Sequence, residues 1–312
     1  MKAIICTKYG PPEVLQLKEV EKPTPKDNEV LIKIYATSVT ASDCIIRGFK
    51  LPFKMWLPAR LALGISKPRK AILGLVLSGK IEKVGDSVKQ FKKGDKVFAH
   101  TLFQFGAYAE FICVPEVSAI ALMPYNTSFD EAAAIPFGGT LALYYLQKAN
   151  IQKGQKVLVF GASGAVGTSA IQLAKYFGAE VSGVCSTANL ELVKSLGADT
   201  VIDYTTDDFT DNGTQYDLIF DAVGKKKSAH LPYKKALTPN GRFISVDDGS
   251  PGEKAVCKAN LNILKELVEA SKLKPVIDKI YPFEQIVEAH RYVDKGHKKG
   301  NVIITIGNNH KE

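Results

Sequence analysis

The fold is decided by the stretch Val157-Leu158-Val159-Phe160-Gly161-Ala162-Ser163-Gly164-Ala165-Val166-Gly167, which leads into a helical pattern over 168–175. A short apolar run that enters a glycine-rich turn and then a helix is the context of a dinucleotide-binding loop. Free N–H groups and the dipole at a helix N-terminus favour an anion, and side chains would block its approach. The spelling Ala162-x-Gly164-x-x-Gly167 therefore predicts a nicotinamide dinucleotide site. The alternative is a loop that only turns the chain.

Strand and helix patterns alternate after this loop. The expected strands are 180–185, 200–204, 216–221 and 241–246, and a helical pattern over 190–196 ends at Gly197. Strands that read as continuous apolar runs between helices are typical of a parallel sheet that is covered on both faces. The fold class is therefore α/β, with a doubly wound parallel-sheet domain in the middle of the chain.

The end of the second strand bears on the choice of cofactor. A carboxylate about 20 residues beyond the glycine turn would bind the ribose 2′-hydroxyl of NAD, but the chain reads Cys185-Ser186-Thr187-Ala188-Asn189 there. Ser186, Thr187 and Asn189 can donate hydrogen bonds to a 2′-phosphate, with Lys175 or Lys194 as a nearby positive charge. We therefore expect NADP(H) as the cofactor. The same residues could instead only cap the following helix.

The segments before and after this domain have different sequence patterns. Short alternating β patterns with Gly and Pro punctuation fill the first part of the chain and predict a compact antiparallel domain. The last part carries helical patterns over 260–271 and 283–295 and a final strand over 301–306. We expect residues 1–122 and 256–312 to form one discontinuous domain, and residues 123–255 to form the dinucleotide-binding domain.

Seven blocks in order along the chain resemble the medium-chain dehydrogenase/reductases, and within them the zinc-independent quinone oxidoreductase-like branch. They are Gly10–Leu15, Val39–Asp43, Val84–Val97, Gly106–Glu110, Ala132–Pro136, Thr140–Ala142 and Gly161–Gly167. The resemblance implies a GroES-like catalytic domain, a Rossmann domain and hydride transfer from NADPH to a quinone or an α,β-unsaturated carbonyl. It also implies the cofactor contacts, which are Thr140 at the nicotinamide, Ser163, Gly164, Ala165, Val166 and Gly167 at the pyrophosphate, Tyr204 at the adenine end, and Ala222, Val223 and Gly224 after the fourth strand.

No metal is expected. The five cysteines are scattered and form no C-x-x-C pair. The zinc-dependent relatives have a Cys-His pair at Thr40-Ala41 and a Gly-His-Glu triplet at Gly74-Leu75-Val76, whereas the side chains here cannot replace those ligands. A conjugated carbonyl fits a reaction without a Lewis acid, because the added electron density delocalises.

The catalytic side chain is less defined. Many zinc-free relatives have Asn at the position of Thr40. Thr40 could contact the substrate oxygen, or it could only shape a turn. Asp43 is expected to hold this loop through backbone N–H groups. The histidines at positions 100, 230, 290, 297 and 310 form no nucleophile–base motif, and His290 is expected at a surface or an interface.

Composition sets the remaining expectations. The formal charge of +9 identifies no partner. Few cysteines, an N-terminus that begins in a strand and no apolar stretch of bilayer-spanning length favour a reducing compartment, with the cytoplasm as the default. No specific nucleic acid and no membrane insertion are expected. A rival class is a family member that retains the dinucleotide site but has a mainly RNA- or protein-binding role.

The segment 44–81 has an unusual composition, which is basic and apolar. Between Asp43 and Glu82 every charged residue is basic, and apolar residues are interleaved with them. The resemblance implies an apolar lid with a basic rim, while a membrane-surface or RNA-binding patch and an ordinary packed segment are the alternatives. The prolines at 52, 58 and 68 argue against one long amphipathic helix.

The segment after Val246 is short. It leaves a turn and at most residues 254–257 as a vestigial sixth strand, the strand that pairs across a dimer in many relatives. We therefore expect a monomer or an atypical homodimer, with Asp247, Asp248 and Pro251 blunting the exposed strand edge.

Overall fold

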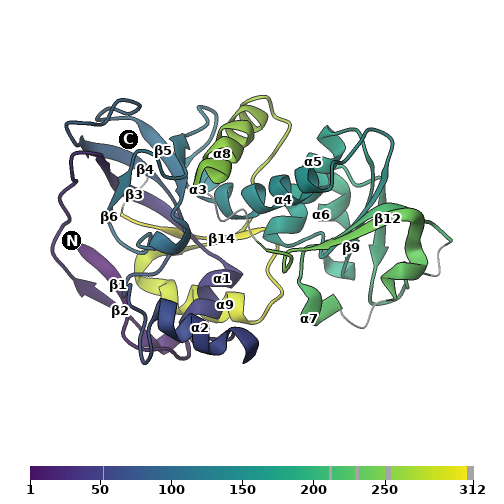
Figure 1. Ribbon diagram of the computed structural model, residues 1–312, viewed down its shortest axis with the longest axis horizontal. Coiled ribbons are helices and arrows are strands. Elements are labelled where there is room, and N and C mark those ends of the chain that lie inside the picture. The colour runs from purple at the N-terminus through teal and green to yellow at the C-terminus, as the bar shows by residue number, and fades with distance from the viewer. Residues whose placement is uncertain (52, 211–212, 229–231, 250–253, 308–312) are drawn as a thin grey trace. The chain divides into compact units, whose positions relative to one another are not determined.

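The computed structural model describes residues 1–307 except 52, 211–212, 229–231 and 250–253. The expectations for Pro52, His230, Pro251 and His310 lie outside these residues. The chain forms two compact units, one from Met1–Pro136 with Ile277–Glu312 and one from Phe137–Val276 (Figure 1).

The first unit is rich in antiparallel strands. Its large sheet has the order β13-β14-β3-β4-β5-β7 with β6 also paired to β3, and β1 and β2 form a separate pair. The strands are β1 (Lys2–Cys6), β2 (Leu15–Glu19), β3 (Glu29–Val39), β4 (Val76–Val84), β5 (Lys96–His100), β6 (Phe111–Pro115), β7 (Ile120–Leu122), β13 (Ile277–Pro282) and β14 (Asn301–Thr305). The helices are α1 (Ala41–Gly48), α2 (Phe53–Leu63), α3 (Phe129–Ala133) and α9 (Ile286–Asp294), with short 3₁₀ turns at Pro12–Val14, Leu102–Gln104 and Phe283–Gln285.

The core of the first unit is apolar and continuous. Val30, Ile32 and Ile34 of β3 are almost fully buried, and they belong to one cluster with Ile304 of β14 and Ile286 of α9. Residues from the end of the chain thus complete the core of this unit.

The second unit is built on five parallel strands. Their order is β10-β9-β8-β11-β12, and all four pairings are parallel. The strands are β8 (Lys156–Phe160), β9 (Glu180–Cys185), β10 (Thr200–Asp203), β11 (Tyr216–Asp221) and β12 (Leu237–Ser245). The helices are α4 (Pro136–Lys148), α5 (Ala165–Tyr176), α6 (Leu190–Ser195), α7 (Lys225–Ser228) and α8 (Lys254–Glu269), with 3₁₀ turns at Thr187–Asn189 and Tyr233–Ala236. The predicted doubly wound sheet is confirmed.

The units divide after Pro136 and after Val276, not at the positions expected from the sequence. Helix α3 belongs to the first unit because Phe129 stacks on Tyr35 at 4.5 Å and its carbonyl accepts a hydrogen bond from Ser78. Helix α8 belongs to the second unit, where the Asn260 amide donates to the Thr140 carbonyl.

Two expectations for the segment after Val246 have different outcomes. The vestigial strand at residues 254–257 is wrong, because these residues begin the helix α8. The expected exposed strand does lie at an edge, since β12 is the last strand of the sheet. The Ser245 N–H at its end donates to the carboxylate of Asp248, which satisfies one backbone donor there.

Candidate dinucleotide-binding site

The site lies at the carboxyl edge of the parallel sheet in the second unit. From β8 the strand order runs through β9 to β10 on one side and through β11 to β12 on the other. The loops after β8 and β11 therefore flank the point where the order reverses, which is where open α/β sheets bind ligands. These loops contain Ser163–Gly167 and Ala222–Gly224, so the structure brings two of the predicted cofactor segments to the same edge of the sheet.

The glycines of the first loop have separate tasks. Gly161 has φ +79°, which a side chain would strain, and a Cβ there would lie 2.3 Å from a methyl group of Val223. A Cβ on Gly167 would lie 2.2 Å from the Gly161 carbonyl oxygen, so this glycine is required for packing the helix onto the strand. A Cβ on Gly164 would meet only the Gly161 oxygen, at 3.5 Å. Gly164 is therefore free to serve ligand approach.

Helix α5 begins directly after this loop. Gly164 is its N-cap and makes no side-chain capping bond, and Ala165 and Val166 are buried at the first turn. The first N–H groups of a helix have no intrahelical acceptor. An N-terminus without a side-chain cap, next to a glycine that leaves room, fits the pyrophosphate of a dinucleotide.

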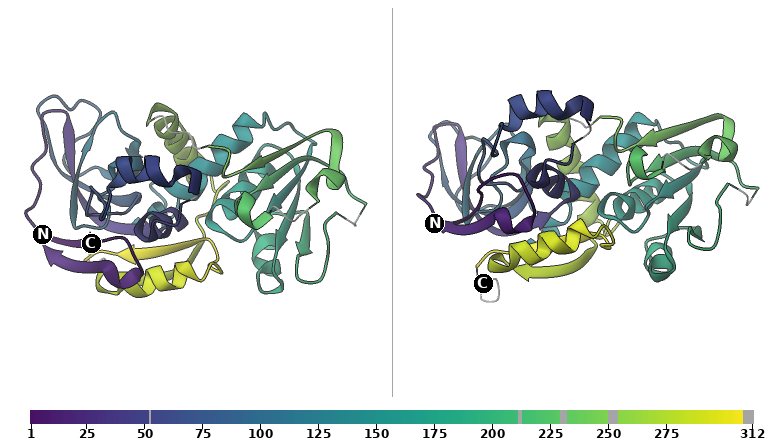
Figure 2. Two further views of the ribbon diagram at one scale, coloured as in Figure 1. Left: turned by 60° about the horizontal axis from the view of Figure 1, so that its bottom comes forward. Right: turned by 90° about the horizontal axis from the view of Figure 1, so that it is seen from below.

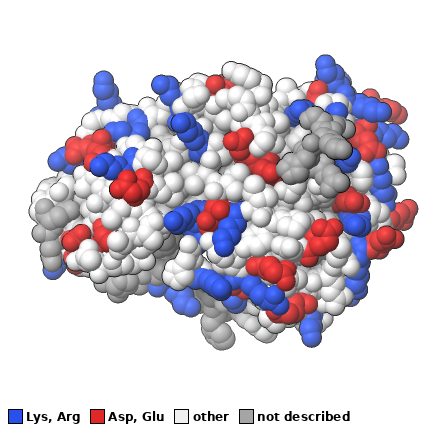
Figure 3. Space-filling view, turned by 180° about the vertical axis from the view of Figure 1, so that it is seen from behind, with Lys and Arg blue, Asp and Glu red and all other residues white. Residues whose placement is uncertain are grey.

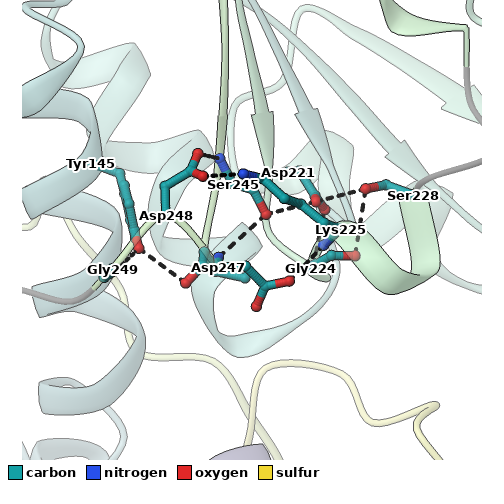
Figure 4. Close-up of polar contacts among 10 residues, drawn as sticks. Tyr145, Asp221, Gly224, Lys225, Ser228, Ser245, Asp247, Asp248 and Gly249 are labelled. Carbon is teal, nitrogen blue, oxygen red and sulfur yellow. Dashed lines mark hydrogen bonds and ion pairs between the residues drawn. The ribbon is translucent and has the colours of Figure 1, made fainter. Parts of the chain in front are cut away.

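A buried carboxylate holds the loop after β11. Asp221 accepts hydrogen bonds from the N–H groups of Val223 and Gly224, both at 3.0 Å. It also accepts from the hydroxyls of Ser228 at 2.7 Å and Ser245 at 2.9 Å (Figure 4). Four donors around a fully buried side chain offset its desolvation. The loop is therefore fixed to two other elements, α7 and β12.

The adjoining turn after β12 is also hydrogen-bonded. Asp247 accepts the N–H of Lys225, Lys225 also forms an ion pair with Asp248, and Tyr145 of α4 donates to the carbonyls of Val246 and Gly249 (Figure 4). These contacts connect the loops after β11 and β12 with α4, the helix that carries Thr140.

The predicted 2′-phosphate cluster follows β9. The amide of Asn189 donates to the hydroxyls of Ser163 at 3.1 Å and Ser186 at 3.2 Å, which links this cluster to the phosphate loop. The hydroxyl of Thr187 donates to the carboxylate of Asp203. Hydrogen bonds from Thr187 and Thr205 hold the pKa of Asp203 below its usual range, so a negative charge lies beside the cluster.

Three other predicted residues have clear positions. Tyr204 is 54% exposed at the end of β10, and its N–H donates to the Cys185 carbonyl. Thr140 is fully buried in α4. Lys175 is in the last turn of α5, at the end of the helix that is distant from the phosphate loop, and it forms an ion pair with Asp199 at 2.8 Å. The expectation that Lys175 supplies charge to the cofactor is therefore wrong.

In the first unit, Thr40 and Asp43 cap α1. The Thr40 hydroxyl donates to Asp43 at 2.6 Å and accepts the Asp43 N–H at 3.1 Å, while the Asp43 carboxylate also accepts the Thr40 N–H at 2.9 Å. Asp43 thus holds the loop as expected. Burial raises its pKa to about 6, although the hydrogen bonds from Thr40 act in the opposite direction.

The expectation that His290 is a surface or interface residue is wrong. It is fully buried in α9, its Nδ1 lies 3.4 Å from the Cys44 sulfur, and the Tyr108 ring packs edge-on against it. Burial, and then the charge of Arg47, lower its pKa to about 3. Burial also raises the pKa of Cys44, so this is a neutral pair without an activated thiolate.

Metal ligands do not cluster in the described part of the chain, where no group of three or more His, Cys, Asp or Glu side chains is placed to hold an ion. At two positions that bind zinc in the zinc-dependent relatives, this chain has Thr40, whose hydroxyl is hydrogen-bonded to Asp43, and Leu75, which is buried. These side chains do not form a zinc site.

Sequence reasoning missed two site residues. Asp221 ends β11 and Asp203 ends β10, and each gains its importance from hydroxyls supplied elsewhere in the chain. The only signal was position, because a carboxylate at the end of a parallel strand reaches the ligand-binding edge of the sheet.

Together, an antiparallel GroES-like unit and a doubly wound unit with a glycine loop at its switch point define a two-domain nicotinamide-dependent dehydrogenase or reductase. Comparison with known families agrees. Residues 26–125 match the alcohol dehydrogenase GroES-like domain, and residues 196–304 match the family described as zinc-binding dehydrogenase. The chain belongs to the medium-chain dehydrogenase/reductase family, with relatives among the quinone and alkenal oxidoreductases.

Three similar proteins illustrate this placement. The chain is 38% identical to 2-methylene-furan-3-one reductase of Solanum lycopersicum and 34% identical to a chloroplastic NADPH-dependent alkenal/one oxidoreductase of Arabidopsis thaliana. Each alignment covers 97% of this chain and 79% of the relative. The quinone oxidoreductase of Coxiella burnetii superposes with a TM-score of 0.84 at 30% identity, covering 98% of this chain and 99% of that one.

Proposed function

We propose that the protein is an oxidoreductase that transfers hydride from NADPH to a quinone or an α,β-unsaturated carbonyl. The observation that carries the proposal is the glycine loop at the switch point of the parallel sheet, where Gly164 leaves room at the N-terminus of α5. The activities for which the similar alkenal/one oxidoreductase and quinone oxidoreductase are named support this substrate class.

The chain's own residues bind and orient the cofactor. The N–H groups of Ala165, Val166 and Gly167 would hold the pyrophosphate, and the Asp221-anchored turn Ala222–Gly224 would position the end of the cofactor nearest the switch point. When bound, the dihydronicotinamide supplies a hydride. We retain Thr140 as the nicotinamide contact and Tyr204 as the adenine contact.

We retain Thr40 as the candidate for contact with the substrate oxygen. Its hydrogen is engaged with Asp43 while that carboxyl is ionised. Since burial brings the Asp43 pKa to about 6, part of the population carries a proton there near neutral pH. Protonated Asp43 can donate to the Thr40 oxygen, which leaves the Thr40 hydrogen for the substrate.

NADP(H) rather than NAD(H) is the proposed cofactor. The Ser186 hydroxyl, which accepts a hydrogen bond from the Asn189 amide, can donate its own hydrogen to a 2′-phosphate, and the Thr187 hydroxyl holds the nearby Asp203 carboxylate through a hydrogen bond. Thr187→Asp should reverse or abolish the preference, because it adds a negative charge and releases Asp203. Fluorescence titration with both cofactors measures this, and equal affinities in the unmodified protein would contradict a 2′-phosphate role for the cluster.

Turnover tests the activity. Purified protein should oxidise NADPH with members of a panel of quinones, enals and enones, and a chelator should leave the rate unchanged. If the whole panel gives no turnover while the protein binds RNA with a steep salt dependence, the RNA-binding alternative replaces the proposal. One tightly bound zinc per chain in elemental analysis would contradict the metal-free chemistry.

We also propose a reducing compartment, with the cytoplasm as the expected location. All five cysteines are unpaired thiols, and four of them are buried. In the described residues no helix is long and apolar enough to cross a bilayer.

A further inference from the structure

The segment around α2 exposes apolar side chains that the proposed chemistry does not use. Trp56 is 45% exposed, Leu57 62%, Leu61 59% and Ile65 72%; we call these four residues the α2 patch. Figure 2 draws α2, in dark blue, at the surface of the first unit. A contiguous exposed apolar patch marks an interaction site, whereas apolar side chains exposed singly are normal.

Contacts of Arg60 and Tyr9 hold α2 and the turn that follows it. The Arg60 guanidinium lies 4.8 Å from the Tyr9 ring centre, 3.8 Å from that of Phe49 and 5.0 Å from that of Trp56. It also donates to the Ile65 carbonyl. The Tyr9 hydroxyl donates to the Gly64 carbonyl at 3.1 Å. Because Arg60 and Tyr9 fasten the inner side of the helix and its following turn, Leu57 and Leu61 remain exposed.

The charges beside the patch have one sign. Lys67, Arg69 and Lys70 are exposed, and in the part of the chain that the structure describes none of them has an acidic partner. The Arg69 N–H donates to the Leu63 carbonyl, which places this basic run against the end of α2. By contrast, Lys and Arg are interspersed with Asp and Glu over the face drawn in Figure 3.

We propose that residues 56–70 bind the surface of an anionic lipid bilayer. Trp and Leu side chains favour the boundary between head groups and acyl chains, and neighbouring lysines and arginines are attracted by anionic head groups. Binding is peripheral, since no helix in the described residues can span a bilayer. The inference goes beyond the proposed reductase activity and does not depend on it.

Charge and chemistry favour this occupant over two others. A symmetric contact with a second copy would bring the two basic runs together, because a two-fold interface uses the same surface on both partners. Single-stranded RNA would need aromatic faces for base stacking, whereas three of the four patch residues are aliphatic. A bilayer offers an apolar boundary region for the aliphatic side chains and anionic head groups for the basic ones.

Trp56 provides a direct test because it is the only tryptophan in the chain. Its emission should shift to shorter wavelength with vesicles of phosphatidylcholine and phosphatidylglycerol, and lipids with brominated acyl chains should quench it. Vesicles of phosphatidylcholine alone should bind at least tenfold more weakly, and high salt should weaken binding to the anionic vesicles.

Two sets of variants separate the apolar and basic contributions. Leu57→Ser with Leu61→Ser, and Lys67→Ala with Arg69→Ala and Lys70→Ala, should each reduce vesicle partition at least tenfold. Matched controls are Val117→Ser with Tyr125→Ser, and Lys89→Ala with Lys153→Ala and Lys272→Ala, which change exposed residues elsewhere and should retain binding. Circular dichroism verifies that all variants fold.

The absence of quenching by brominated lipids would overturn the proposal. So would an emission shift that depends on protein concentration without lipid, which indicates self-association, or one produced by an RNA oligonucleotide but not by vesicles.

Discussion

At the scale of single residues, buried polar groups hold the loops in place. Asp221 fixes the loop after β11 through four donors, and Asp43 fixes the start of α1. Removing one partner of such a group leaves a desolvated donor or acceptor, which costs about 1–3 kcal/mol. These residues therefore affect the site without touching a ligand.

His290 should make the protein sensitive to acid. Its pKa falls from 6.5 in the unfolded chain to about 3 in the folded one. Between these values only the unfolded chain binds a proton at this ring, so folding stability falls as the pH falls through this window. We expect His290→Phe to remove up to about 3 kcal/mol of the stability loss between roughly pH 6.5 and pH 4. Urea unfolding across this range measures it.

An unchanged acid dependence in His290→Phe would contradict this assignment. His100 is the internal control, since burial lowers its pKa to about 4 and it should retain its own part of the acid dependence.

Sequence reasoning predicted the glycines of the loop but not the buried polar partners. The roles of Gly164 and Gly167 were predictable from their spacing within one loop. The role of Asp43 was predictable because it lies only three positions after Thr40. The Asp221 network joins Ser228 and Ser245, and the His290 contact joins Cys44 across 246 positions. Only the tertiary fold creates such neighbours, so a helical pattern around His290 could not reveal its burial.

At the scale of elements, the loop between β8 and α5 combines binding and packing. Gly164→Ala should leave the free energy of unfolding within about 1 kcal/mol, because the added Cβ meets only one oxygen at 3.5 Å. NADPH affinity should fall at least tenfold, because the methyl group occupies the space for the pyrophosphate.

Gly167→Ala is the matched comparison. Its Cβ would lie 2.2 Å from the Gly161 oxygen, so this variant should lose about 1–3 kcal/mol of stability through overpacking. Urea unfolding and cofactor titration distinguish the two glycines. A Gly164→Ala protein that binds NADPH normally would contradict the role assigned to this loop.

The strands of the second unit were predictable because they are continuous apolar runs, and the order of elements implied parallel pairing. The start of α8 could not be predicted from the sequence. Ala, Val and Cys at 255–257 suit a strand or a helix equally, and contacts of Asn260 with the Thr140 carbonyl and of Leu264 with the space beside Gly139 determine where this element packs.

At the scale of the whole molecule, the edge strand β12 predicts the assembly. At its end the Asp248 carboxylate accepts the Ser245 N–H, and the Asp247 N–H donates to the Ser245 hydroxyl. Charge at an edge opposes strand pairing between molecules. We expect a monomer, or a homodimer formed through another surface. Light scattering together with a crystal structure tests this. A continuous sheet formed by β12 of two subunits would refute it.

We propose that a dinucleotide bound at the switch point of the second unit delivers hydride to a conjugated carbonyl. The most direct test is turnover with NADPH that carries deuterium on the transferred face of its nicotinamide C4. With an enone substrate, mass spectrometry and NMR should find one deuterium at the carbon β to the carbonyl, and the Gly164→Ala variant should form this product more slowly at limiting cofactor. A reduced product without deuterium from either face of C4, or NADPH oxidation without a reduced product, would contradict this hydride transfer.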